Sequence, residues 1–176
     1  MYYPLSIFSY TSQEYASLIH NALGKGAQHA LLMYSEWFRS GKIEGNHPAF
    51  LNAQALYREI CSLTDCSYPA VNASHQEGGT GKFLLKTKDQ LEIESVIIPM
   101  QAGSTLCVSS QLGCKMGCSF CETGRMGLLR NLAVSEIVSQ AFIAKFVLKT
   151  PIRNIVLWEW ESLLIIMTML WGPSAF

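Results

Sequence analysis

The sequence predicts a mixed α/β protein (α+β overall), with a small helical N-terminal domain, then a β-hairpin, then a βαβ unit. Three observations predict this class. Apolar residues recur at helical spacing in the first third, the period changes to two after residue 82, and the next part reads strand, long loop, amphipathic helix, strand. The 176 residues are 49% hydrophobic and 15% charged, which is too apolar for a disordered chain and sufficient for one core.

The first part of the chain is predicted to form three helices, because apolar residues at helical spacing lie between Gly, Pro and Asn breakers. These segments are Ser12–Leu23, Gly26–Ser40 and Leu51–Leu63. The polar stretch Tyr68–Lys82 carries glycines at 78, 79 and 81 and is predicted to be a flexible connection. We therefore expect residues 1–75 to form a helical accessory domain and residues 76–103 to form a linker and a hairpin.

Three strands are then predicted, over Phe83–Lys86, Leu91–Pro99 and Thr105–Ser109, with Thr87–Gln90 as the turn of the hairpin. An amphipathic helix over Val134–Lys149 precedes a short apolar strand, Asn154–Leu157. This order predicts a βαβ unit with parallel strands. The loop Gln111–Gly127 then lies at the carboxyl end of the first strand, which is where ligands bind in parallel α/β folds.

Charge and hydropathy exclude several classes of protein. There are 13 Lys and Arg against 13 Asp and Glu, so a nucleic acid must be met by a local patch and not by a global field. The N-terminus has no signal-peptide pattern, and the apolar run Leu163–Trp171 is far shorter than the roughly 18 residues of a membrane span. We therefore expect a cytoplasmic protein with no membrane association, whose cysteines are reduced or bind metal.

Three of the six cysteines, Cys114, Cys118 and Cys121, form a Cys-x3-Cys-x2-Cys pattern in the long loop. Three thiolates at this spacing can bind three irons of a 4Fe–4S cluster and leave the fourth iron open to S-adenosylmethionine (SAM), which is the radical SAM arrangement. A zinc loop would want a fourth ligand nearby, and no histidine follows the pattern. Three incidental thiols are the other alternative. Cys61 and Cys66 lie elsewhere and are interpreted as a packed thiol and a loop thiol.

The residues around this pattern closely resemble the RlmN/Cfr family of radical SAM RNA methyltransferases, and RlmN more than Cfr. The resemblance runs up to Leu157 and is carried by the segments Thr105–Cys114, Cys118–Gly127, Arg130–Leu132 and Glu136–Val138. It implies that residues 104–157 begin a partial TIM-type barrel with the cluster loop, and that residues 1–75 are the accessory domain that faces RNA. It also implies a cytoplasmic monomer that uses a 4Fe–4S cluster and SAM.

The resemblance implies methylation of C2 of an adenine in 23S rRNA and in tRNA, with an electron donor such as flavodoxin. Glu94 matches the family's proton acceptor, and Cys107 matches the cysteine that resolves the covalent adduct. Without the family, Cys107 would be interpreted as core and Glu94 as a solvated strand residue. Arg125 and Arg130 are candidate RNA phosphate contacts, or belong to a generic turn. Methylation of C8, as in Cfr, is the alternative for the intact parent.

The sequence departs from the family after Leu157. Members continue Met-Gly-Met-Gly-Glu-Pro-Leu, whose Gly-Glu segment helps to bind SAM, whereas residues 158–171 read WEWESLLIIMTMLW. Residues 158–171 can be encoded by a set of synonymous codons that, with one adenine added before them, translates in the shifted frame as MGMGEPLDNYDDVM. We therefore expect residues 158–176 to be an out-of-frame tail after a one-nucleotide deletion, against the alternative of a genuine terminal helix.

The chain as given also lacks the family's methyl-carrying cysteine, so we expect it to be catalytically inactive and poorly soluble. A non-catalytic remnant that binds RNA or an iron–sulfur cluster, and a zinc-binding interaction module, are the alternatives from other classes of protein. A smaller departure is Ala133, where members carry a threonine N-cap with Glu136 three residues on. Loss of such a cap costs about 1 kcal/mol.

Overall fold

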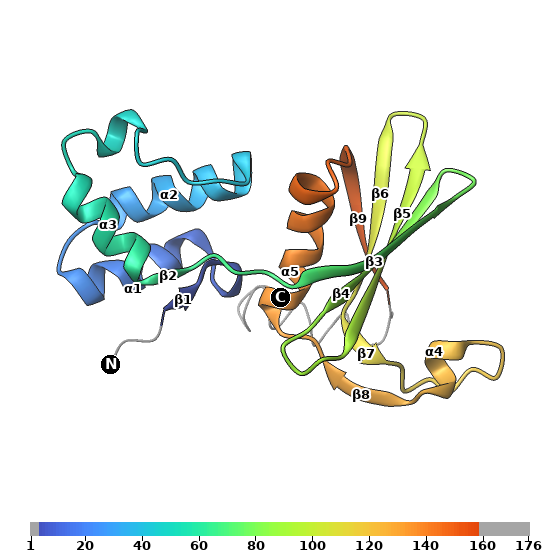
Figure 1. The fold of residues 1–176 in the computed structure, drawn as a ribbon. Coiled ribbons are helices and arrows are strands. Elements are labelled where there is room, and N and C mark those ends of the chain that lie inside the picture. The colour runs from blue at the N-terminus through green and yellow to red at the C-terminus, as the bar shows by residue number, and fades with distance from the viewer. Residues whose placement is uncertain (1–3, 159–176) are drawn as a thin grey trace, which may run out of the picture. The chain divides into compact units, whose positions relative to one another are not determined.

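A computed structural model describes residues 4–158 of the chain, which divides into two compact units, Met1–Ser67 and Tyr68–Phe176 (Figure 1). The first unit is helical and the second is built on a β-sheet, which confirms the predicted α/β class. The predicted out-of-frame tail lies outside the described residues, apart from its first residue, which ends the last strand. Among residues 4–158, none of the helices has the length and apolar character that crossing a membrane requires.

The three predicted helices of the first unit are confirmed. The unit contains β1 (Leu5–Ser6), η1 (Ile7–Ser9), α1 (Ser12–Leu23), α2 (Ala27–Ser40), η2 (Pro48–Phe50), α3 (Gln54–Ser62) and β2 (Thr64–Asp65). Helix α1 starts where the sequence provides a capping box: the Thr11 N–H donates to Glu14 Oε2 at 2.8 Å, and the Glu14 N–H donates to Thr11 Oγ1 at 3.3 Å. The apolar stripes of the helices form the core of the unit, with the side chains of Ile7, Ile19, Met33, Phe50 and Ile60 buried.

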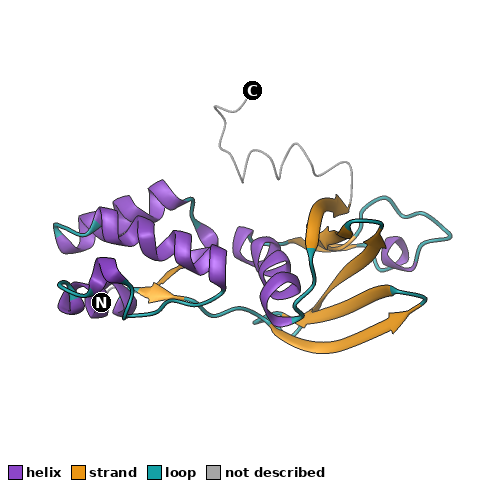
Figure 2. Ribbon diagram, turned by 90° about the horizontal axis from the view of Figure 1, so that it is seen from above, coloured by secondary structure: helices purple, strands orange, loops and turns teal. Residues whose placement is uncertain are grey.

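The second unit contains a five-stranded sheet in the order β3-β4-β5-β6-β9. Figure 2 shows the strands of the chain in orange and its helices in purple. Its strands are β3 (Ala70–Glu77), β4 (Thr80–Lys86), β5 (Glu92–Met100), β6 (Gly103–Ser109) and β9 (Ile152–Trp158). Strands β3 to β6 pair antiparallel with their neighbours, whereas β6 and β9 are parallel. The predicted hairpin and βαβ unit are therefore both confirmed.

Strand β3 corrects one expectation, because it occupies most of the segment predicted to be a flexible connection. It pairs with β4 from Ala70 opposite Lys86 to Glu77 opposite Thr80. Nearly all of its side chains are exposed on both faces, so the alternation that marks a half-buried strand is absent from its sequence. Gly78 and Gly79 adopt φ of 55° and 88° in the turn, a conformation that favours glycine.

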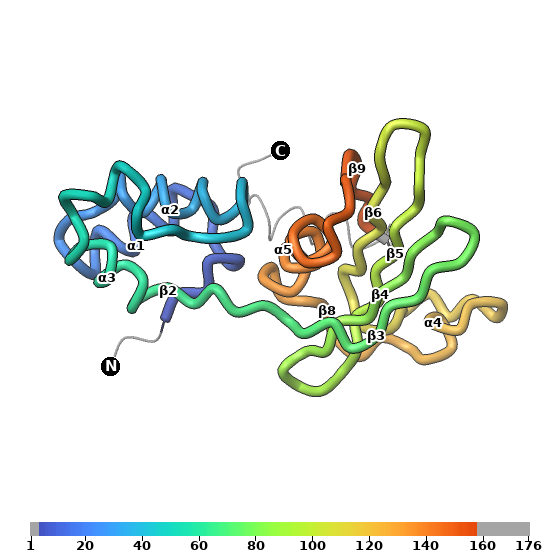
Figure 3. Tube along the Cα trace, turned by 45° about the horizontal axis from the view of Figure 1, so that its top comes forward, coloured from blue at the N-terminus to red at the C-terminus, as the bar shows by residue number. Residues whose placement is uncertain are grey.

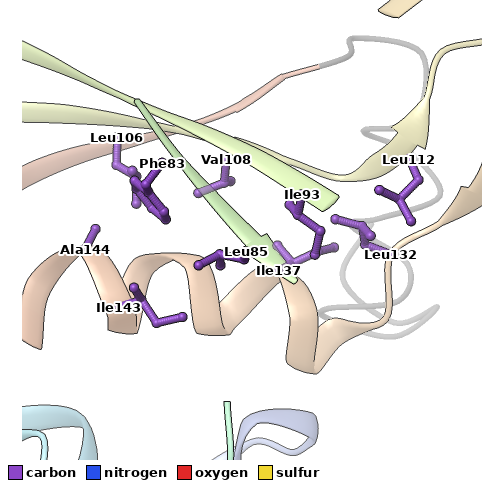
Figure 4. Packing of buried hydrophobic residues seen from close by; sticks show 10 residues of the cluster. All are labelled: Phe83, Leu85, Ile93, Leu106, Val108, Leu112, Leu132, Ile137, Ile143 and Ala144. Atoms are coloured by element: carbon purple, nitrogen blue, oxygen red, sulfur yellow. The ribbon is translucent and has the colours of Figure 1, made fainter. Parts of the chain in front are cut away.

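One face of the sheet is covered by helix α5 (Val134–Phe142) and its wider continuation η3 (Ile143–Val147). Figure 4 shows the apolar side chains of the strands directed at this helix. The buried cluster consists of Phe83, Leu85, Ile93, Leu106, Val108, Leu112, Leu132, Ile137, Ile143 and Ala144. The strands contribute alternate residues to it, as the pleat of a sheet requires. The opposite face of the sheet therefore carries the other half of each strand's side chains.

The long loop between β6 and α5 is more ordered than the sequence predicts. It contains a two-stranded antiparallel ribbon, β7 (Gln111–Gly113) with β8 (Leu128–Asn131), and a four-residue helix, α4 (Glu122–Arg125). Figure 3 shows the chain leaving the sheet through this ribbon and turning back at α4. The ribbon was missed because β7 has three residues and β8 four, which is too short for a periodic pattern.

The candidate cysteine-loop site

The ribbon brings the two ends of the cysteine loop together. The Cys114 N–H donates to the Gly127 carbonyl at 3.2 Å, so the loop of residues 114–127 is closed at its base. Gly113 has a φ of 74°, and a Cβ atom there would lie 1.8 Å from the Gly127 carbonyl oxygen. A side chain at position 113 is therefore excluded on steric grounds, and glycine permits the backbones to approach this closely.

The three cysteines of the pattern all lie in this closed loop and are all half-buried. The Cys121 N–H donates to the Cys118 carbonyl at 3.1 Å, which makes a turn between the second and third cysteines. Across the described part of the chain, no three Cys, His, Asp or Glu side chains are gathered closely enough to hold a metal ion. The donor set nevertheless fits a 4Fe–4S cluster in kind. The loop supplies three free thiols, which are the ligands that such a cluster takes, and all three are partly exposed.

The loop also exposes an unusual amount of apolar surface. The Phe120 side chain is 91% exposed, and those of Met116, Met126 and Leu129 are all more than half exposed. Single exposed apolar residues are ordinary, but several on one short loop mark a binding surface. The surface surrounds the three cysteines, so a ligand of the loop would meet both thiols and apolar side chains.

Glu94 and Cys107 lie on the face of the sheet that α5 does not cover. Cys107 alternates with Leu106 and Val108, which point into the core, and it lies directly opposite Val96 in the pairing of β5 with β6. Glu94 is two residues from Val96 on β5, so it shares this face with Cys107 as its diagonal neighbour. Strand β6 leads from Cys107 towards the cysteine loop, which places both residues on the strands next to it.

The two side chains differ in environment. Cys107 is buried, and this burial raises the pKa of its thiol, so the thiol is protonated at neutral pH. Glu94 is partly exposed, and its Oε2 lies 2.6 Å from the Lys82 ammonium across the β4–β5 pair. Its backbone carbonyl accepts a 2.8 Å hydrogen bond from the Ser109 hydroxyl, which fixes β5 against the end of β6.

The two arginines proposed as RNA contacts have different surroundings. Arg125 is exposed on α4, where its guanidinium lies 3.3 Å from the Glu122 carboxylate. Arg130 makes five donor contacts inside the chain, two to Asp89, two to Glu136 and one to the Asn131 carbonyl, all at 2.8–3.2 Å. A guanidinium has five N–H donors, so all five donors of Arg130 have partners inside the chain, and its contact with RNA phosphate stays a prediction.

Sequence reasoning missed Gln140, which is fully buried in the otherwise apolar face of α5. Its Oε1 accepts from the Ser95 hydroxyl at 2.8 Å and from the Ser109 N–H at 2.9 Å, and its Nε2 donates to the Ser109 carbonyl at 2.9 Å. The available signal was a polar residue four positions after Glu136 on a helix whose inner face is apolar.

Comparison with known proteins gives consistent relatives for the segment that the chain spans. It is 63% identical over 153 residues to "Probable dual-specificity RNA methyltransferase RlmN 1" of Protochlamydia amoebophila, a match that covers 87% of this chain and 43% of that protein. It is 36% identical over 164 residues to "Dual-specificity RNA methyltransferase RlmN" of Lawsonia intracellularis, covering 86% of this chain and 46% of that protein. The chain thus spans less than half the length of these curated relatives. No family model matches it.

A solved structure agrees with these relatives. The chain superimposes on a radical SAM methyltransferase from Sphaerobacter thermophilus with a TM-score of 0.74 and 26% sequence identity. The superposition covers 95% of this chain and 51% of that one. The mixed α/β fold described above is therefore the fold of the corresponding half of that protein.

Proposed function

Over the segment that it spans, this chain belongs to the RlmN family of radical SAM RNA methyltransferases, and we propose that it is the cluster-bearing portion of an enzyme that methylates C2 of adenine in 23S rRNA and in tRNA. The observation that carries this proposal is the placement of the cysteine loop after the carboxyl end of β6, with Cys107 and Glu94 on the uncovered face of the adjoining strands. One sheet face and one loop thus carry Glu94, Cys107 and the three cysteines of the pattern, which are the residues of this chain to which the resemblance gives a chemical role.

In this proposal Cys114, Cys118 and Cys121 would hold a 4Fe–4S cluster. Such a cluster, together with SAM, would supply one-electron chemistry that can remove a hydrogen atom from an unactivated methyl group. The exposed apolar side chains of the loop would exclude water from the cluster once another surface covers them. The ribbon keeps the loop at the end of the sheet.

Glu94 acts as the proton acceptor in the proposed reaction. Its carboxylate lies 2.6 Å from the Lys82 ammonium, which holds the side chain on the face of the sheet that it shares with Cys107. Cys107 resolves the covalent adduct between protein and RNA through its thiol. Burial raises the pKa of that thiol, which lowers the fraction present as the reactive thiolate.

We further propose that a polypeptide of these 176 residues alone does not methylate RNA. Residues 158–171 do not contain the Gly-Glu segment that helps the family to bind SAM, and the methyl-carrying cysteine is absent from the sequence.

The experiment first reads the gene across codons 150–176 and beyond. We expect one missing nucleotide after the Leu157 codon, with the restored frame continuing through Gly-Glu-Pro to a downstream cysteine. The restored protein and the 176-residue chain are then incubated anaerobically with SAM, a reductant and unmodified 23S rRNA. The restored protein should form 2-methyladenosine, and the 176-residue chain should form none.

Three results would contradict parts of this proposal. Product formed by the 176-residue chain would refute its inactivity, and 8-methyladenosine from the restored protein would assign the Cfr reaction instead. Methylation that survives Cys118→Ala in the restored protein would refute the role of the cysteine loop.

A further inference from the structure

Both ends of the cysteine loop are attached to the first turns of one helix, α5. The side chains responsible are Glu136 and Gln140, which lie one helical turn apart and therefore on the same side of α5. Glu136 holds β8, the strand that follows the loop, and Gln140 holds the end of β6, the strand that precedes it. Neither residue is a candidate cluster ligand or proton acceptor.

The outgoing end is held through Arg130 of β8. Its guanidinium forms paired hydrogen bonds with the Glu136 carboxylate at 2.8 and 2.9 Å and with the Asp89 carboxylate at 2.9 and 3.0 Å. Asp89 lies in the turn between β4 and β5. The Arg130 side chain therefore joins the cysteine loop to the sheet through Asp89 and to α5 through Glu136. Paired contacts of this kind fix orientation as well as distance, because the fork of the guanidinium matches a carboxylate.

Electrostatics reinforce this attachment. Hydrogen bonds from Arg130 and Thr87 lower the pKa of the Asp89 carboxyl to about 2. Burial acts to raise the pKa of Glu136, but hydrogen bonds from Arg130 and from the Ala133 N–H outweigh it, so the pKa falls below its usual value. The Ala133 N–H donates to Glu136 Oε2 at 2.8 Å, so Glu136 also caps α5 at a position where the N-cap side chain has no oxygen.

The incoming end is held through Ser109, the last residue of β6. Gln140 binds both the N–H and the carbonyl of Ser109 at 2.9 Å, and it accepts from Ser95 of β5 at 2.8 Å. The Gln140 side chain is fully buried, so its amide has no water to exchange these partners for. The backbone enters the ribbon two residues later, at Gln111.

We propose that Glu136 and Gln140, acting through Arg130 and Ser109, are positioning residues that fix both ends of the cysteine loop to α5 and the sheet, so that its three thiols can gather around a cluster. The loop needs such support because its own apolar side chains point to solvent and give it little packing of its own. Ligands must be held to about half an ångström to bind a metal group well, and outer residues that orient them commonly change affinity by about 10- to 100-fold. This inference rests on the proposed function in so far as the bound group is a cluster.

The test uses the full 176-residue chain, kept soluble by an N-terminal carrier domain and reconstituted anaerobically with ferrous iron and sulfide. Iron release to a chelator and the electron paramagnetic resonance spectrum of the reduced cluster are measured for wild type, Arg130→Gln, Arg130→Lys and Glu136→Gln. The matched control is Arg153→Gln, an exposed arginine near the start of β9, at the opposite end of the sheet from the loop. Amide hydrogen exchange of residues 111–132 is measured on the cluster-free chains.

We expect Arg130→Gln and Glu136→Gln to speed iron release by about 10- to 100-fold and to broaden the spectrum, while Arg153→Gln matches wild type. Arg130→Lys should recover only part of the effect, because an ammonium cannot make paired contacts with two carboxylates. In the cluster-free chains, exchange should accelerate in residues 111–132 and stay unchanged in β4 and β5.

Unchanged release, spectrum and exchange in Arg130→Gln would overturn the inference. Equal acceleration of exchange throughout the sheet would overturn it too, because the ion pairs would then support the fold and not the loop. Failure of the wild-type chain to bind iron and sulfide would instead refute the proposed function. The exchange of residues 111–132 would still decide whether Arg130 holds the loop.

Discussion

The sheet with α5 and the cysteine loop belong to the same unit but are stabilised in different ways. The sheet and helix bury a continuous apolar cluster, in which residues such as Leu85, Ile93 and Leu106 are fully inaccessible to solvent. The loop exposes its large apolar side chains, with Phe120 at 91%, and depends on a few hydrogen bonds and one close glycine contact. The scaffold therefore derives its stability from burial, whereas the loop keeps its shape through polar contacts at its ends.

This difference suggests why the site is placed where it is. A loop that is stabilised at its ends can change its shape at a lower cost in free energy than a packed core can, because repacking a core is costly. A packed sheet with such a loop at the end of β6 therefore combines a rigid support with an adaptable segment. The four predictions below test that contrast, starting with the largest expected effect.

The contrast predicts that truncation in the core is costly and truncation on the loop is not. Ile93→Ala should lower the free energy of unfolding by about 2–5 kcal/mol, because it leaves a cavity at a fully buried position. Phe120→Ala should change it by less than about 0.5 kcal/mol, because the ring is almost wholly exposed. Urea denaturation followed by circular dichroism measures both, and equal effects would remove the distinction between the regions.

Gln140 is one of several fully buried polar residues, and its removal should lower the free energy of unfolding nearly as much as Ile93→Ala does. Gln140→Leu keeps the size of the side chain but leaves the Ser95 hydroxyl and both backbone groups of Ser109 without this partner. We expect a loss of about 3 kcal/mol in the free energy of unfolding, since buried groups left unsatisfied cost about 1–3 kcal/mol each. Gln140→Glu serves as the companion variant, because it keeps the oxygen that accepts from Ser95 and Ser109 and loses the nitrogen that donates to the Ser109 carbonyl. A neutral result for Gln140→Leu would show that these hydrogen bonds do not hold β6.

The closure of the loop can be tested with two glycines of similar backbone conformation. Gly113 and Gly117 have φ of 74° and 62°, but a Cβ at 113 would meet the Gly127 carbonyl, whereas a Cβ at 117 has nothing within 4 Å. Each alanine variant carries the strain of positive φ, which is about 1 kcal/mol, and Gly113→Ala carries the collision in addition. Gly113→Ala should therefore expose the amide of Cys114 to hydrogen exchange, and Gly117→Ala should leave it protected. Equal protection in the two variants would show that the ribbon does not close the loop.

The smallest effect is a dependence of loop protection on pH. The pKa of Asp89 is about 2 in the folded chain, against 3.8 as its ordinary value. The ionised carboxylate therefore stabilises the folded chain above the unfolded pKa, and this stabilisation is lost as the pH falls through the folded pKa. Glu136 shifts in the same direction. Protection of amides in residues 128–132, corrected for intrinsic exchange, should be constant down to about pH 5 and decline between about pH 4 and 2. Asp89→Asn should weaken that decline, and a decline that starts near neutral pH would implicate other groups.

Much of the scaffold could be predicted from the sequence, because its signals are local. The helix Ser12–Leu23 has the predicted bounds, and the alternation around Ile93 identified the strand. Strand β3 could not be predicted in this way, since its side chains are polar on both faces and its partner strand defines it.

In the candidate site, too, the features that are local in the sequence could be predicted and those that depend on distant residues could not. The cysteine pattern is local in sequence and was found there, and the shared face of Glu94 and Cys107 follows from the predicted strands together with their observed register. The partners of Arg130 could not be found, because Asp89 is 41 residues away and the pairing exists only when the turn, β8 and α5 meet. The predicted roles of Glu94, Cys107 and the three loop cysteines stay predictions until they are measured.

The central claim is that the loop of Cys114, Cys118 and Cys121 binds an iron–sulfur cluster, and anaerobic reconstitution tests it most directly. Iron, acid-labile sulfide and zinc are measured in the wild-type chain, in Cys118→Ala and in the control Cys66→Ala, whose thiol has its pKa raised to about 11 by burial and is a poor ligand. We expect about four iron and four sulfide per chain in wild type and Cys66→Ala, with little of either in Cys118→Ala. Bound zinc without sulfide, or iron and sulfide that persist in Cys118→Ala, would contradict it.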